Sequence, residues 1–135
     1  MNEVFNPFDE VRIDTRSASY IDLTGQDKWT SWTVSRAGWT DVGSPTVTGR
    51  FQIKGKLCLF QVSVVPSTSI ATTAGASYIA LPTTAKGYGG VVTMYNATMN
   101  VAVGLGGVDV TNSRAHIPSQ GASGNTFTIS GWFEV

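Results

Sequence analysis

Residues 45–66 alternate between apolar and polar side chains in two arms, a pattern that predicts a β-hairpin. Alternation with a period of two is typical of a strand with one buried face. Gly55-Lys56 lies between the arms, where a tight reversal needs the positive φ that glycine adopts without strain. Pro45 and Pro66 bracket the pair, because proline cannot donate a hydrogen bond to a sheet ladder. The inward residues are expected to be Val47, Gly49, Phe51 and Ile53 in the first arm and Cys58, Phe60, Val62 and Val64 in the second.

The rest of the chain after residue 28 is also typical of β-structure. At its end, Phe127, Ile129, Gly131, Phe133 and Val135 share one face of a predicted strand. Shorter strands are predicted at residues 78–81, 91–95, 100–105, 108–111 and 114–118, with Gly104, Gly106 and Gly107 marking a bend or bulge. Residues 67–77, 83–90 and 119–125 are expected to be loops. Seven to nine short strands without a helical period predict an all-β fold, an antiparallel β-sandwich of jelly-roll-like topology.

Residues 1–28 differ from the remainder and predict an extended N-terminal arm beside a sandwich domain at residues 29–135. The arm has six acidic and three basic residues, a formal charge of −3 that the body balances with +3. A disordered terminus is the alternative, since disorder concentrates at chain ends. Aromatic and β-branched residues favour an arm that docks, because solvated tails seldom keep them. The predicted anchoring residues are Phe5, Phe8, Val11, Ile13 and Tyr20.

The composition excludes several classes of partner. Charged residues make up 13% of the chain and the formal net charge is zero, so no overall field attracts nucleic acid or an anionic membrane. The acidic N-terminus lacks the basic and apolar regions of a signal peptide. Cys58 is the only cysteine, which rules out a disulfide within the chain and predicts a buried structural thiol. Only Lys86 and Asp109 are charged between Leu57 and Ser113, which suggests that another chain covers much of this surface.

The residues after the arm offer little for catalysis. The carboxylates there are Asp41, Asp109 and Glu134, and His116 is the only histidine. No strained nucleophile turn of the G-x-S-x-G kind occurs, and neither zinc-ligand nor calcium-loop spacing is present. We therefore expect a protein that is not an enzyme and that has no metal site and no cofactor.

Three tryptophans, Trp29, Trp32 and Trp39, lie close together in the sequence. Exposed indole rings could form a platform on which sugar rings or bases stack. The same residues could instead pack against the sandwich or another subunit, and the residue pattern leaves both interpretations open. The nucleic-acid version is weak, because Lys28 and Arg36 are the only cations beside them.

The order of motifs in residues 29–135 resembles a module found in bacteriophage virion proteins. The motifs are W-x-x-W-T at residues 29–33, P-T-V-T-G-R-F at 45–51, G-K-L-C-L-F-Q-V-S-V at 55–64, S-Y-I-A-L-P at 77–82 and I-S-G-W-F-E-V at 129–135. Together they span about four-fifths of the chain. Such modules are β-sandwiches, often trimeric, at the ends of tail fibres and tailspikes and on other external phage proteins. The resemblance implies a non-enzymatic, oligomeric protein on the virion surface, made in the host cytoplasm without a signal peptide.

A short arm on a compact sandwich suits a homotrimeric capsid decoration (cement) protein that binds the phage major capsid protein. Trp132, on the otherwise polar face of the last strand, is the predicted subunit contact. The alternative is a tail fibre or tailspike head, attached to a tail protein, that binds a host-surface carbohydrate. In that case the predicted stacking residues are Trp29, Trp32, Trp39 and Tyr88. Neither version involves nucleic acid or a membrane.

Overall fold

A computed structural model describes residues 28–135, so the predicted anchoring residues Phe5, Phe8, Val11, Ile13 and Tyr20 lie outside the described residues. From residue 28 onward the chain forms twelve β-strands and no helix, and every strand pair is antiparallel. The prediction of an all-β antiparallel fold is therefore confirmed. Among these residues there is accordingly no helix that could cross a membrane.

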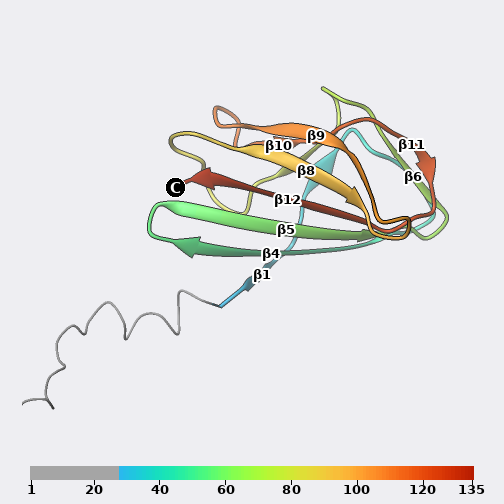
Figure 1. Cartoon of the computed structure of the whole chain (residues 1–135), viewed down its shortest axis with the longest axis horizontal. Helices are drawn as coiled ribbons and strands as arrows, with labels where there is room; N and C mark the ends of the chain where they lie inside the picture. Colours follow the sequence, from blue (N-terminus) through green and yellow to red (C-terminus); the bar gives the residue numbers. More distant parts are fainter. Residues whose placement is uncertain (1–27) are drawn as a thin grey trace, which may run out of the picture.

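The strands form two sheets. Their bounds are β1 (Thr30–Trp32), β2 (Arg36–Ala37), β3 (Thr40–Val42), β4 (Thr46–Lys54), β5 (Leu57–Val65), β6 (Ser69–Thr72), β7 (Tyr78–Ala80), β8 (Val91–Asn96), β9 (Val101–Asp109), β10 (Arg114–His116), β11 (Gln120–Ser123) and β12 (Phe127–Glu134). The nine-stranded sheet has the order β1-β4-β5-β12-β8-β9-β10-β7-β2, and the three-stranded sheet has the order β11-β6-β3. Figure 1 shows β4, β5, β12 and β8 side by side, with β6 and β11 at one end of the molecule.

The predicted central hairpin is present as β4 and β5. The two strands pair over their full length, from Thr46 opposite Val65 to Lys54 opposite Leu57. Gly55 makes the turn with a φ of 62°, in the left-handed region that glycine reaches without strain. The predicted last strand, β12, pairs with β5 on one side and with β8 on the other, so it lies in the middle of the larger sheet. Both strand predictions are confirmed.

The buried apolar residues form one continuous core. Every second residue of β5 is buried. The thiol of Cys58 is among them, with 0% exposure, as predicted. Ile70 of β6 belongs to the same cluster, so both sheets contribute residues to the core. The largest fully buried side chains are Phe60, Phe127, Phe133, Ile70, Ile79, Met94, Ile117 and Ile129. Burial of apolar area on this scale is the main stabilising contribution to such a domain.

Three details of the secondary-structure prediction are wrong. The segments predicted as loops at residues 67–77 and 119–125 contain β6 and β11, which pair with each other. Their small residues show no alternation, and the pairing joins segments about fifty residues apart. The strands predicted at residues 100–105 and 108–111 are one strand, β9, although the predicted bulge is present beside Gly104, where the pairing of β9 with β8 shifts between Met94 and Tyr95. A side chain at Gly106 would lie within contact distance of the His116 carbonyl, so this glycine permits close packing rather than a bend.

Candidate binding surface

The outward face of the larger sheet carries a polar depression with a volume of about 540 Å³. Paired residues on neighbouring strands point to the same face, which brings distant positions together here. Ser31 of β1 is opposite Arg50 of β4, and Arg50 is opposite Gln61 of β5. A second row lies two residues further along the strands and consists of Thr48, Ser63 and Thr128. The lining residues are Ser31, Thr48, Gly49, Arg50, Gln61, Val62, Ser63 and Thr128.

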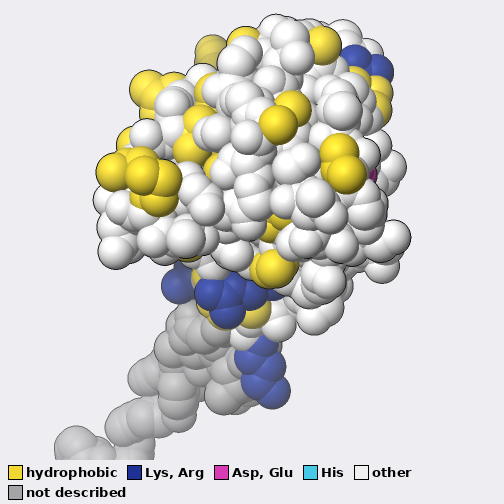
Figure 2. All heavy atoms as spheres, turned by 90° about the vertical axis from the view of Figure 1, so that its right-hand side faces the viewer, with side chains coloured by type: hydrophobic (Ala, Val, Ile, Leu, Met, Phe, Trp, Pro, Cys, Tyr) yellow, Lys and Arg dark blue, Asp and Glu magenta, His cyan; other side chains and the backbone are white. Residues whose placement is uncertain are grey.

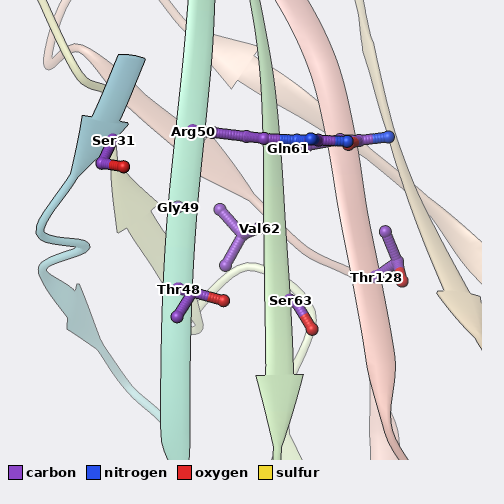
Figure 3. A pocket seen from close by; sticks show the side chains of 8 residues that line it. All are labelled: Ser31, Thr48, Gly49, Arg50, Gln61, Val62, Ser63 and Thr128. Carbon is purple, nitrogen blue, oxygen red and sulfur yellow. The ribbon is translucent and has the colours of Figure 1, made fainter. Parts of the chain in front are cut away.

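Two neighbours hold the guanidinium group of Arg50 in place. Its Nε and Nη2 atoms donate hydrogen bonds to the Gln61 side-chain carbonyl, at 3.0 and 2.6 Å. The guanidinium carbon also lies 4.6 Å from the centre of the Trp29 ring, a cation–π distance. Figure 3 shows Arg50 and Gln61 extended in the same direction, with Thr48, Ser63 and Thr128 at the other end of the depression. The charged group is therefore oriented before any ligand arrives.

Hydroxyl groups line most of the remaining surface of the depression. They belong to Ser31, Thr48, Ser63 and Thr128. In the part of the chain that the structure describes, none of these four hydroxyls hydrogen-bonds to another protein group. Each can both donate and accept a hydrogen bond, so the depression offers unpaired groups of both kinds.

Beside the depression, the same face carries an apolar area that we call the outer patch, formed by Leu57, Leu59, Val91, Leu105 and Trp132. Trp132 of β12 pairs with Leu59 of β5, and its indole ring covers Gly90. Trp132 is 38% exposed and Leu105 is 68% exposed. The strands of this area, β5, β12, β8 and β9, contain two carboxylates and no lysine or arginine. Glu134, opposite Leu57, borders the patch. An apolar surface with an exposed tryptophan resembles the central part of a protein interface.

The four residues predicted to stack on sugar do not form one cluster. Trp32 points inward, and its ring contacts Phe51 and Phe60 edge to face with centroids 6.3 Å apart. Trp39 is half-buried, and its Nε1 donates a hydrogen bond to the Tyr78 carbonyl at 3.1 Å. These two tryptophans pack against the core.

The other two predicted stacking residues are exposed but lie on different parts of the fold. Trp29, 41% exposed, lies next to Arg50 at the depression. Tyr88, 77% exposed, precedes β8, and its backbone N–H donates to the Glu134 carboxylate at 3.1 Å. Only Trp29 is therefore close to the polar depression.

The lining residues of the depression were missed by the sequence analysis, although their polar faces were predicted. Thr48 and Arg50 fall on the outward face of the first predicted arm, and Thr128 on that of the last strand. Polar outward residues are the rule on a half-exposed sheet, so alternation alone does not single them out. The missing information was the strand order, which brings β1 and β12 to either side of the hairpin.

Cationic side chains gather near the start of the described chain. Figure 2 shows one end of the molecule, where hydrophobic side chains are scattered and several Lys and Arg side chains gather at the lower edge of the described atoms. Residues 28–135 contain seven lysines and arginines and three carboxylates, a formal charge of +4. The described surface is therefore basic on balance, although the whole chain has a formal charge of zero.

His116 and Asp109 lie near each other on β10 and β9, with 3.8 Å between Nε2 and Oδ2. Hydrogen bonds from the side chain and the backbone of Asn112 hold the pKa of the Asp109 carboxyl below its usual value, with a smaller contribution from His116. Between residues 28 and 135 no three His, Cys, Asp or Glu side chains lie close enough together to hold a metal ion. Comparisons with protein-family models, with curated proteins and with solved structures found no match to this chain.

Proposed function

We propose that this protein is a non-enzymatic structural component of a bacteriophage virion, namely a homotrimeric capsid decoration (cement) protein. The observation that carries the proposal is the outer patch, an apolar area on the face of β5, β12, β8 and β9. The resemblance of the motif order to phage virion modules is the basis for proposing that the protein is part of a virion, that it is a trimer and that its fold is a jelly-roll-like sandwich.

The outer patch is assigned to a second copy of the same chain. Trp132 and Leu59 form a cross-strand pair at its centre, and Val91 and Leu105 extend it across two more strands. Tryptophan is enriched among residues that dominate binding energy in interfaces. The five residues of the patch carry no charge, and the Glu134 carboxylate at its border accepts a hydrogen bond from the Tyr88 backbone.

Attachment to the particle is assigned to residues 1–28, with the phage major capsid protein as the partner. These residues combine a net acidic charge with the aromatic and β-branched anchors Phe5, Phe8, Val11, Ile13 and Tyr20. An anchor joined to a compact domain raises the effective concentration of the domain at the particle surface. In a trimer, three anchors would act together and strengthen attachment without any new contact.

The first test locates the full chain on virions by labelling and imaging at a resolution that separates head from tail. The mass of the purified full chain is measured in parallel by light scattering after gel filtration. Many copies over the head together with a trimeric mass are the expected results. A monomeric mass at the concentration present on particles, or an absence of copies from the head, would contradict the cement proposal.

A second candidate function is a tail fibre or tailspike head that binds a host-surface carbohydrate. The specific observation in its favour is a depression lined with hydroxyl groups and with Arg50, whose guanidinium group lies over the Trp29 ring. Of the four residues predicted to stack on sugar, only Trp29 lies close to this depression. A few copies at the tail in the same imaging experiment would favour it over the capsid role.

A further inference from the structure

We propose that the polar depression is a binding site for an acidic saccharide, a sugar that carries a carboxylate. Arg50 would bind the carboxylate, and the hydroxyls of Ser31, Thr48, Ser63 and Thr128 would bind the sugar hydroxyls. This inference rests on the second candidate function and deepens it by naming the chemical class of the ligand. Trp29 acts as a positioning residue that holds the guanidinium group from one side.

The first argument is the state of the Arg50 guanidinium group. Arginine has five N–H donors, and the two hydrogen bonds to Gln61 leave the Nη1 group without a partner in residues 28–135. Gln61 accepts these bonds with a neutral carbonyl, so it orients the cation without neutralising it. The unoccupied end of the guanidinium group presents two nitrogens in a fork, the geometry that binds a carboxylate with two parallel hydrogen bonds.

The second argument is the location of the described carboxylates. Asp41 forms a two-point ion pair with Arg36 at 2.8 and 2.9 Å. Asp109 accepts hydrogen bonds from Asn112, and Glu134 accepts one from the Tyr88 backbone. All three are therefore engaged at other places among the residues that the structure describes. A negative charge brought by a ligand would complement the Arg50 cation at this site.

The third argument is the hydroxyl row. Thr48, Ser63 and Thr128 lie at paired positions on three adjacent strands, so their spacing follows the distance of about 4.8 Å between strands. That spacing is comparable with the width of a sugar ring, and each hydroxyl can donate to or accept from a sugar hydroxyl. The volume of about 540 Å³ falls in the range of small-ligand sites and has room for a disaccharide.

The single cation also distinguishes between classes of anion. Nucleic-acid strands are bound through several phosphate contacts, which need a track of lysines and arginines. The depression has one arginine among eight lining residues, and the others are neutral. One negative charge on an otherwise hydroxylated ligand matches this arrangement, and an acidic sugar has that composition.

The test is a titration of the full chain with a disaccharide that contains glucuronic acid, followed by amide chemical shifts in NMR spectra. The neutral disaccharide with glucose in place of glucuronic acid is titrated in the same way. We expect shift changes at β4, β5 and β12 with the acidic sugar and affinity at least tenfold weaker for the neutral sugar. Binding at other strands would overturn the assignment of the site.

The variants separate a role in binding from a role in structure. Arg50→Gln should weaken binding of the acidic sugar at least tenfold, and Thr128→Val should weaken it severalfold while leaving the charge in place. The matched control is Arg114→Gln, because Arg114 also lies over an aromatic ring, that of Tyr78 at 4.1 Å, but outside the depression. The control should bind normally.

The outcomes distinguish this inference from the function on which it rests. Equal binding of both disaccharides, or preference for the neutral one, would overturn the acidic class but leave carbohydrate binding in place. An Arg50→Gln variant that binds as tightly as the unmodified chain would have the same effect. Failure of the folded chain to bind either sugar would overturn both the inference and the second candidate function.

Discussion

Substitution of Gly49 by alanine tests how tightly the first strand packs onto the hairpin. Gly49 is buried on β4 and pairs with Trp32 of β1. A Cβ atom at this position would lie 2.5 Å from Cγ2 of Val34 and 2.7 Å from Cε3 of Trp32. Both distances are far below van der Waals contact. The Trp32 ring has little room to move, since Phe51 and Phe60 contact it edge to face.

The expected cost of this substitution follows from two opposing effects. Extra atoms in a packed interior cost about 1–3 kcal/mol. Replacing glycine in a strand recovers about 0.5–1 kcal/mol of backbone entropy. We therefore expect Gly49→Ala to lower the free energy of unfolding by about 1–2 kcal/mol. The matched control is Gly107→Ala on β9, where a Cβ atom would meet nothing within 4 Å, and it should be neutral or slightly stabilising.

The assay is urea unfolding followed by tryptophan fluorescence, with a double-mutant cycle to identify the clash. Val34→Ala removes the nearest methyl group, so the double variant should lose about 0.5–1 kcal/mol less than the sum of the single variants. Gly49→Ala as stable as Gly107→Ala would refute the close packing of Trp32 on β4. Strict additivity of the two single variants would assign the loss to something other than this contact.

The other predictions concern three single side chains. Burial raises the pKa of the Cys58 thiol to about 11. Its labelling by a disulfide reagent at pH 8 should therefore be at least about 100-fold slower in the folded protein than in denaturant. Because this thiol loses its proton at higher pH when folded than when unfolded, its contribution to stability is present below pH 9 and falls as pH rises toward 11. The unmodified chain should lose about 1.4 kcal/mol more than Cys58→Ala between pH 8 and pH 10 in urea unfolding, and equal losses would contradict the shift. Ser77→Ala should cost about 2 kcal/mol in the same assay, because its buried hydroxyl donates to the Gly38 carbonyl at 2.5 Å and accepts from the Thr73 N–H at 2.8 Å. Trp132→Ala removes roughly 95 Å² of exposed apolar area, which would contribute about 2 kcal/mol per contact where a second copy covers it. In gel filtration, the oligomer of the variant should therefore dissociate at a higher protein concentration than the oligomer of the unmodified chain. An unchanged oligomer would count against Trp132 as the subunit contact.

The parts of the fold that the sequence predicted correctly are those with strong local alternation. Cys58, Phe60, Val62 and Val64 occupy every second position of β5 and are all fully buried. The turn at Gly55 was predictable for a similar reason, because a local φ requirement selects glycine. Both signals need only a few neighbouring residues, and neither depends on which strands pair later.

The polar depression was not predictable in that way, because its residues come from four strands and lie together only when the strand order is known.

The tryptophans show the same limit of prediction from local sequence. Trp29 and Trp32 are three positions apart, an odd offset, so an extended chain must place them on opposite faces. Which of the two points inward depends on the pairing of Trp32 with Gly49, a residue without a side chain that leaves space for the ring. Alternation alone contains no information about that pairing.

The central position of β12 also bears on how the chain reaches its folded state. Two hairpins, β4-β5 and β8-β9, can form from neighbouring residues as soon as they are synthesised. They are joined in the sheet only through β12, which comes after both of them in the chain. Until β12 inserts, each hairpin has an unpaired edge next to apolar side chains, the kind of surface that associates with other chains. Folding therefore has a late, nonlocal step, and the molecule is most prone to aggregation during the interval before that step.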